Sequence, residues 1–209
     1  MKRYGRAIVK WNGGNGALLC NHCMLIIDEG LDQNDVEHYC DECKSEGIDN
    51  WKDALTKKYA HMFAAGGYPA VGGGWRDLVE RCLFRIEWAR GDGVVRIHQI
   101  KEKFGGIRIY AGGKNAGDAG VCEAIDLAEM RSLCTCEDCG DEGRLYDRAG
   151  WYLTRCMRHA QGQPVVQKYP RLRVVTSWGD GGKRVTTCRS YDRELDVFVP
   201  AKFPADYNE

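Results

Sequence analysis

The sequence lacks the long apolar segments of membrane and secreted proteins. It contains no run of eighteen apolar residues, and no apolar segment of the signal-peptide type follows its first basic residues. It also lacks an even set of cysteines. The eleven cysteines include Cys-x2-Cys pairs, a pattern that argues against a secreted framework of disulfides. We therefore expect a cytoplasmic protein.

Histidine is scarce, and no catalytic constellation can be recognised. A nuclease of the ββα-metal class needs paired histidines with an Asn or Asp nearby, and only five histidines are present: His22, His38, His61, His98 and His159. The glycine pairs at 105–106 and 112–113 do not complete a phosphate-binding motif. A nuclease-type enzyme is thus the least favoured function, because it would need a site built from loops.

Two pairs of metal-ligating residues in the second half of the chain form the clearest motif. Cys136-x2-Cys139 is followed, after sixteen residues, by Cys156-x2-His159. Each pair fits a tight turn that presents two soft donors, and two such turns at this separation make a four-ligand zinc site. The spacing leaves Cys134 open as an alternative to Cys136, although the tight Cys-x2-Cys turn favours Cys136.

The same spacing occurs near the N-terminus. Cys20-x2-Cys23 and Cys40-x2-Cys43 are again separated by sixteen residues. Four cysteines complete a closed site, so the two histidines beside them are not expected to displace a ligand. We therefore predict two Zn²⁺ ions per chain, both structural.

The net charge is zero, but the charges are unevenly distributed. Residues 20–50 carry nine acids and one base, a net charge of −8, whereas residues 144–193 carry eleven bases and three acids, a net charge of +8. An acidic end and a basic end imply different partners at the two ends, or contact between them.

Apolar periodicity and turn residues predict an α+β fold with little regular structure per residue. A helix is expected from Asn50 to the break at Gly66-Gly67. The further elements are a helix over 75–89, strands over 94–99 and 107–110, a helix capped by Asp118, and a hairpin over 145–153. Cys82 and Cys122 fall among apolar helix positions and are predicted to be buried. Trp151 is expected to pack on the third helix.

Four consecutive segments resemble an uncharacterised family of tailed bacteriophages and prophages. They are GWRDLVERCLFRI, HQIKEKFGGIRIYAGG, EAIDLAEMRSLCTCEDCG and GWYLTRCMRHA, and the resemblance covers roughly residues 55–160. It implies a phage origin, with action in the cytoplasm of the host, and it implies no reaction. The N-terminal ribbon resembles the small zinc ribbons of other phage proteins.

The basic C-terminal segment is predicted to be a β-hairpin, with strands over 171–178 and 183–188 and a third strand over 195–199. Basic groups supply affinity for phosphate, and an aromatic ring can stack on a base. The candidate nucleic-acid contacts are Arg171, Arg173, Trp178, Lys183 and Arg184.

The sequence thus predicts three domains: a zinc ribbon over 1–49, a helix–hairpin–helix–zinc module over 50–160, and a basic β extension over 161–209 that begins with a linker. The acidic ribbon would repel phosphates and suits a basic partner protein. We expect a phage accessory protein that binds, and inhibits or redirects, a host or defence protein. The alternative is a nucleic-acid-binding protein that uses the basic hairpin, and the sequence does not decide between the two.

Overall fold

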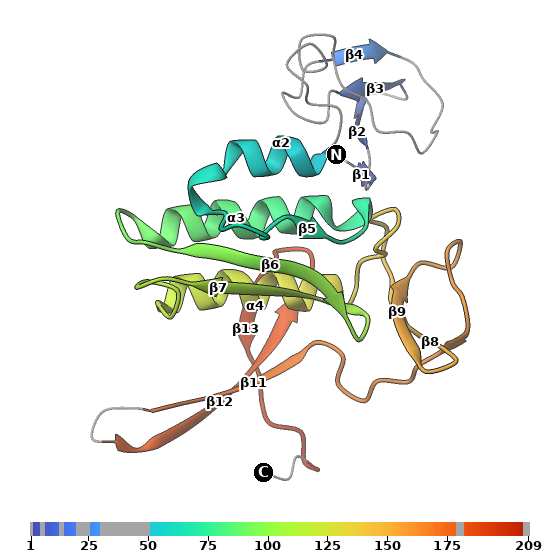
Figure 1. Cartoon of the computed structure of the whole chain (residues 1–209). Coiled ribbons are helices and arrows are strands. Elements are labelled where there is room, and N and C mark those ends of the chain that lie inside the picture. The colour runs from blue at the N-terminus through green and yellow to red at the C-terminus, as the bar shows by residue number, and fades with distance from the viewer. Residues whose placement is uncertain are drawn as a thin grey trace. The chain divides into compact units, whose positions relative to one another are not determined.

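The computed structural model describes the backbone of residues 2–4, 7–12, 15–19 and 26–29, and it describes residues 51–178 and 182–206, with backbone alone at 177 and 178. The chain divides into two compact units, Met1–Val165 and Val166–Glu209. The described residues form an α+β fold (Figure 1), as predicted. The predicted N-terminal ligands Cys20, Cys23, Cys40 and Cys43 lie outside the described residues.

The first sheet has four antiparallel strands in chain order. They are β1 (Lys2–Tyr4), β2 (Ala7–Asn12), β3 (Asn15–Leu19) and β4 (Ile26–Glu29). Asn12 pairs with Asn15 across β2 and β3.

Three α-helices follow in the described residues: α2 (Trp51–Lys58), α3 (Arg76–Arg90) and α4 (Ala119–Ser132). The first ends well before Gly66, and a 3-10 turn at Ala60–Met62 takes its place and still buries Met62. Asp118 occupies the N-cap position of α4, but its side chain makes no capping bond and accepts from Asn115 Nδ2 at 2.9 Å.

A three-stranded sheet packs with these helices. It contains β5 (Pro69–Ala70), β6 (Arg96–Lys103) and β7 (Gly106–Gly112), with β5 parallel and β7 antiparallel to β6. The predicted strand end at residue 99 is wrong, because β6 continues to Lys103 and turns through Phe104 and Gly105 alone. Figure 1 shows the two long strands running alongside α3 and α4.

One apolar cluster joins these elements into what we call the helix–sheet core, residues 51–133. Trp51 and Leu55 of α2, Leu83 and Ile86 of α3, and residues of β6, β7 and α4 are all buried in it. Ile100 pairs with Ile109 across β6 and β7, and both side chains belong to this cluster. The alternation of strand side chains sends their neighbours to the opposite, solvent side.

The chain then forms a second three-stranded sheet, the order of which is β10-β8-β9. Its strands are β8 (Arg144–Arg148), β9 (Trp151–Arg155) and β10 (Gln163–Pro164). The β8–β9 hairpin was predicted. The linker predicted at the start of the third domain is wrong, because Gln163 and Pro164 pair with Asp147 and Tyr146 instead of leaving the fold.

The second unit contains one antiparallel sheet. Its strands are β11 (Leu172–Trp178), β12 (Arg184–Asp192) and β13 (Val197–Pro200), in the predicted order. Cys188 and Tyr191 are buried, and the Tyr191 hydroxyl donates to Asp196 Oδ1 at 2.6 Å.

Candidate metal centre

The first ligand pair lies in a tight turn just after α4. The Cys136 N–H donates to the Asp141 carbonyl at 2.8 Å, and the Gly140 N–H donates to the Cys136 carbonyl at 2.9 Å. Gly140 has a φ of 80°, a left-handed conformation that glycine adopts without steric cost. These bonds hold Cys136 and Cys139 on one side of the turn.

The second pair is brought back by the β8–β9 hairpin. Arg148 pairs directly with Trp151, so the turn has two residues, Ala149 and Gly150, with φ of 51° and 88°. Positive φ at both positions defines a type I′ turn, which matches the twist of paired strands. After β9 a second turn forms, in which the His159 N–H donates to the Cys156 carbonyl at 3.2 Å.

The four predicted side chains converge. The sulfurs of Cys139 and Cys156 are 3.6 Å apart, and His159 Nδ1 lies 3.5 Å from the Cys136 sulfur and 3.4 Å from the Cys156 sulfur. All four donor atoms lie within 4.8 Å of one another. A sulfur separation of 3.6 Å is far longer than a disulfide, at about 2.0 Å. The cluster can therefore hold one metal ion between four donors.

Cys134 is not part of this cluster. It is buried, and its thiol donates to the Arg131 carbonyl at 3.3 Å. Its carbonyl accepts from the Gly143 N–H at 3.1 Å. Cys134 thus serves the turn through its backbone, and the geometry favours Cys136 as the ligand.

The thiols have different electrostatic surroundings. Burial raises the pKa of the Cys139 thiol. Burial also opposes ionisation of Cys156, yet the pKa of that thiol is lowered, because the His159 N–H and neighbouring thiols donate to its sulfur. A bound metal cation would lower the pKa of all three thiols and hold their sulfurs as thiolates.

Charged side chains brace the first turn. Arg155 pairs with Glu137 at 3.0 Å and with Asp138 at 2.9 Å. The side chains of Arg155 and Glu137 are each 12% exposed, so water screens this pair little. The guanidinium therefore ties the end of β9 to the turn that carries the first two cysteines.

A glycine-rich loop, residues 72–74, packs against the metal centre and joins it to the helix–sheet core. The Gly74 N–H donates to the Glu137 carbonyl at 2.8 Å, and a side chain at Gly74 would lie 2.3 Å from the Cys136 carbonyl. Beside it, the buried indole N–H of Trp75 donates to the Thr135 carbonyl at 2.8 Å. The sequence motifs described above do not identify this contact. A signal was present, because a Gly-Gly-Gly-Trp run allows close backbone approach beside a large apolar anchor.

The KEKFGG segment makes a second contact of this kind. The Thr154 hydroxyl of β9 donates to the Gly105 carbonyl at 2.5 Å, and the Gly105 N–H donates to the Glu102 carboxylate at 2.6 Å. A side chain on Gly105 would meet Leu145 at 2.3 Å. Glu102 thus closes its own turn, and the segment supports the hairpin between the ligands. We call residues 134–165 the Cys/His module.

The structure places two other predicted residues differently. Cys122 is exposed on α4, because its position faces away from the apolar cluster, and its thiol donates to the Ala116 carbonyl at 3.7 Å. Trp151 does not pack on α4; 76% of its surface is exposed. It stands at the start of β9 beside the turn, where its ring reaches solvent. Cys82 is buried, as predicted.

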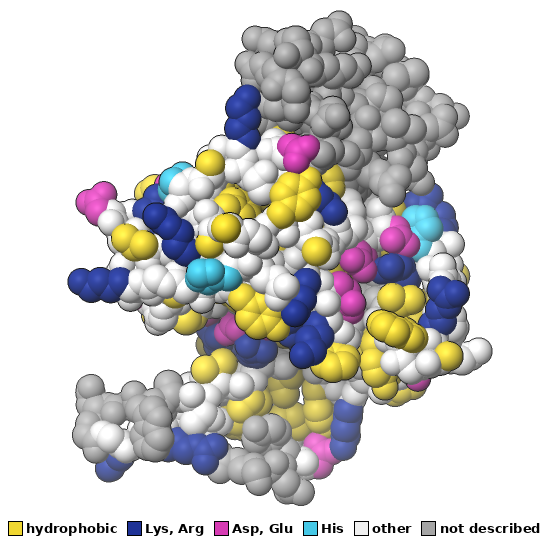
Figure 2. Space-filling model, viewed as in Figure 1, with side chains coloured by type: hydrophobic (Ala, Val, Ile, Leu, Met, Phe, Trp, Pro, Cys, Tyr) yellow, Lys and Arg dark blue, Asp and Glu magenta, His cyan; other side chains and the backbone are white. Residues whose placement is uncertain are grey.

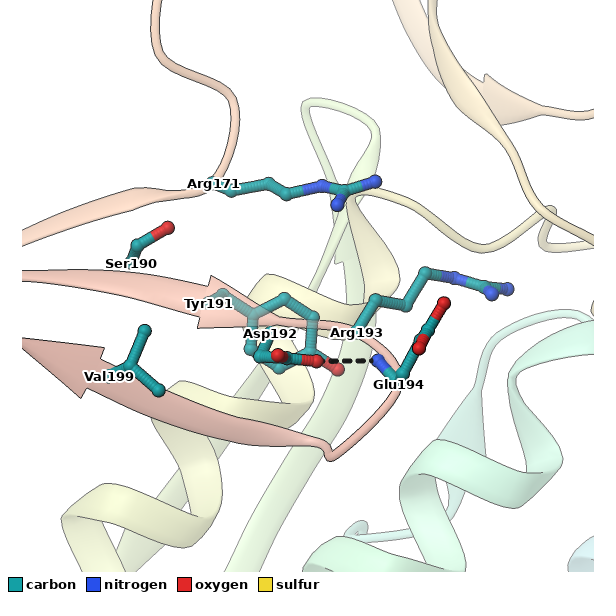
Figure 3. Close-up of a pocket in the computed structure, with 7 residues that line it drawn as sticks. All are labelled: Arg171, Ser190, Tyr191, Asp192, Arg193, Glu194 and Val199. Carbon is teal, nitrogen blue, oxygen red and sulfur yellow. Dashed lines mark hydrogen bonds between the residues drawn. The ribbon is translucent and has the colours of Figure 1, made fainter.

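The predicted basic residues of the second unit lie in different surroundings. Arg171 lines a pocket of about 340 Å³ together with Ser190, Arg193 and Glu194, and Figure 3 shows the two arginine side chains extending to the same side. Arg173, Lys183 and Arg184 do not line this pocket, although Lys183 and Arg184 are exposed. The side chain of Trp178 lies outside what the structure describes.

No protein-family model, curated protein or solved structure matches this chain. The phage resemblance therefore stays a prediction that rests on its motifs. Among the described residues, no helix combines the length and the apolar character that a membrane span requires.

Proposed function

We propose that the Cys/His cluster holds a zinc ion. With Zn–S bonds of about 2.3 Å and a Zn–N bond of about 2.0 Å, a regular tetrahedron has edges of about 3.8 Å between sulfurs and about 3.5 Å between sulfur and nitrogen. The observed separations of 3.4, 3.5 and 3.6 Å lie close to those values. Three thiolates and an imidazole also favour zinc over hard cations, which prefer oxygen.

The ion has a structural role in this proposal. A catalytic zinc keeps one coordination position for water or substrate, whereas four protein donors close the shell. The three cysteines are buried as well. Elemental analysis of Cys136→Ser should therefore show one zinc ion fewer, and Cys134→Ser should retain it. The reverse result would transfer the ligand role to Cys134.

On this scaffold we propose a binding function: a phage accessory protein that acts on a host or defence protein in the host cytoplasm. The observation that supports it is the exposure of large apolar side chains on the Cys/His module. Trp151, the first residue of β9, is 76% exposed, and Met157, two residues beyond the end of β9, is 88% exposed. Exposed aromatic residues on a rigid support are typical anchors of protein interfaces.

Capture from infected-host lysate tests this function. The full chain, loaded with zinc, should retain a partner protein in stoichiometric amount after nuclease treatment. Trp151→Ala with Met157→Ala should lose that partner, whereas Trp88→Ala, which removes an exposed tryptophan of α3, should keep it. Recovery that disappears with nuclease would contradict a protein partner.

Nucleic-acid binding by the second unit is the other candidate. Arg171, Lys183 and Arg184 are exposed there, and the Arg189 guanidinium lies 4.4 Å from the centre of the Phe198 ring. Such groups neutralise phosphates and release counterions, so binding would weaken as salt rises. Changing Arg171, Arg173, Lys183 and Arg184 to Ala should lower the salt slope by roughly one per lost contact. Absence of binding by the intact chain at low salt would end this proposal.

A further inference from the structure

The solvent face of the β6–β7 hairpin carries basic and aromatic side chains. Ile100 and Ile109 face the core, so the neighbouring pairs, Gln99 with Tyr110 and Lys101 with Arg108, occupy the opposite face. Lys103, two positions on, shares that face. Figure 2 shows basic and hydrophobic side chains gathered over these strands and the turn that joins them.

The two lysines of this face contact rings and not carboxylates among the residues that the structure describes. Lys101 Nζ lies 5.3 Å from the centre of the Tyr110 ring, and Lys103 Nζ lies 5.3 Å from that of Phe104. Glu102 is engaged by the Gly105 N–H. Arg108 is partly neutralised, since it lies 3.9 Å from Glu129. The face therefore keeps positive charge that an anion can use.

Phe104 is held in an unusual conformation at the end of this face. Its φ is 56° and that of Gly105 is 78°, so the pair forms a two-residue turn of the I′ kind. Asn or Asp is the ordinary residue at the first position, and a bulky side chain there is strained. Phe104 is nevertheless 66% exposed. Its contribution to the fold does not explain its presence, which points to an external contact.

The aromatic row continues onto the Cys/His module. Thr154 contacts the Gly105 carbonyl through its hydroxyl. Tyr152 lies two residues earlier on the same face of β9, about 7 Å along the strand, and its ring is 38% exposed. We call Tyr110, Phe104 and Tyr152 the aromatic row; Lys101 lies beside Tyr110 and Lys103 beside Phe104.

We propose that this row is a binding site for single-stranded nucleic acid. Rings stack on unpaired bases of any sequence, and adjacent lysines neutralise the phosphates. A duplex hides the base faces that the rings would need. The charge selects a polyanion over an apolar protein surface. The site is separate from the protein interface proposed above, and either can exist without the other.

Fluorescence anisotropy with the full, zinc-loaded chain tests the proposal. The probes are oligothymidylate and oligouridylate of about ten nucleotides, and a mixed-sequence duplex of the same length. We expect both single strands to bind and the duplex to bind much more weakly. Phe104→Asn should weaken single-strand binding about tenfold, yet its melting temperature should not fall, because Asn suits the turn. Lys101→Gln with Lys103→Gln should lower the salt slope by about 1.4.

Two control variants separate this site from general effects. Phe84→Ala removes an exposed ring of α3, and Lys114→Gln removes an exposed charge elsewhere in the unit; both should bind as the unchanged chain does. Equal affinity of Phe104→Asn and the unchanged chain would overturn the proposal. So would equal binding of the duplex, or binding that is lost only when the basic residues of the second unit are replaced. Loss of a nuclease-resistant protein partner with Phe104→Asn would assign the row to a protein.

Discussion

The helix–sheet core and the Cys/His module belong to one unit but are stabilised differently. In the core, side chains from α2, α3, α4, β6 and β7 form one buried apolar cluster. In the module, the cluster of buried residues around the candidate site consists of Cys136, Cys139 and Cys156. A segment this short buries too little apolar surface to fold alone, and bound metal supplies the missing free energy. The comparison shows that metal coordination can replace a core locally.

The two regions meet through backbone groups. Trp75 and Gly74 of the core contact the carbonyls of Thr135 and Glu137, and the Gly105 carbonyl accepts from Thr154. Breaking one of these hydrogen bonds while its groups stay buried is costly, because each group would lose its partner without gaining water. These hydrogen bonds therefore hold the ligand-bearing segments of the Cys/His module against the core. The module in turn covers one end of the core.

The largest expected effect comes from removing the metal. Cys156→Ser with His159→Ala should unfold residues 134–165, because zinc supplies apparent binding free energy on the order of 10 kcal/mol in such segments. Residues 51–133 should stay folded, since their apolar cluster is intact. Hydrogen exchange followed residue by residue checks both expectations, and the zinc content should fall by one ion. Loss of protection in α3 and β6 as well would show that the core depends on the metal.

Trp75 should have the next largest effect, because it belongs to both regions. Its side chain is fully buried, and its indole N–H reaches the Thr135 carbonyl. Trp75→Ala should lower the free energy of unfolding by about 3–5 kcal/mol. Trp75→Phe keeps most of the ring and should lose mainly the hydrogen bond, about 1 kcal/mol. Urea unfolding measures both, and a small loss in the alanine variant would deny Trp75 this joint role.

The sequence predicted the parts of this comparison that depend on local pattern. Helical spacing of apolar residues identified α3, and paired ligand spacing identified the Cys/His cluster. The sequence did not predict how the Cys/His module packs on the core, because Gly74 and Gly105 act through contacts with residues far along the chain. For the same reason Cys122 was misjudged. Its neighbours on α4 are apolar, but which positions face the core depends on how α4 packs on α3 and β7.

The close approach of Gly74 to the Cys136–Gly140 turn tests how tightly the core and the Cys/His module are packed together. A methyl group there would lie 2.3 Å from the Cys136 carbonyl and 2.5 Å from the Gly140 nitrogen, both backbone atoms of the metal turn. Gly74→Ala should therefore destabilise the fold by about 1–3 kcal/mol and weaken zinc retention against a competing chelator. Gly117→Ala, where nothing lies within 4 Å, is the matched control. Equal zinc retention by the two variants would show that the backbone around Gly74 can shift to accommodate a methyl group without affecting the metal site.

The smallest effect is expected from a charge pair on the core, in contrast to the shielded Arg155 pair of the module. Hydrogen bonds from Arg90 lower the pKa of Glu87, burial opposes them, and His61 assists. A carboxyl group whose pKa is lowered by folding stabilises the fold at pH values above its pKa in the unfolded chain, near 4.5. This stabilisation disappears as the pH falls through the lower pKa of the folded state. Because Glu87 is 37% exposed, solvent screens this ion pair, and its contribution to the free energy of unfolding should be about 0.3 kcal/mol. Glu87→Gln should therefore lower the free energy of unfolding slightly at pH 7, and this loss should shrink as the pH falls below about 4.5, as measured by urea unfolding. A loss that does not change with pH would exclude the charge as its cause.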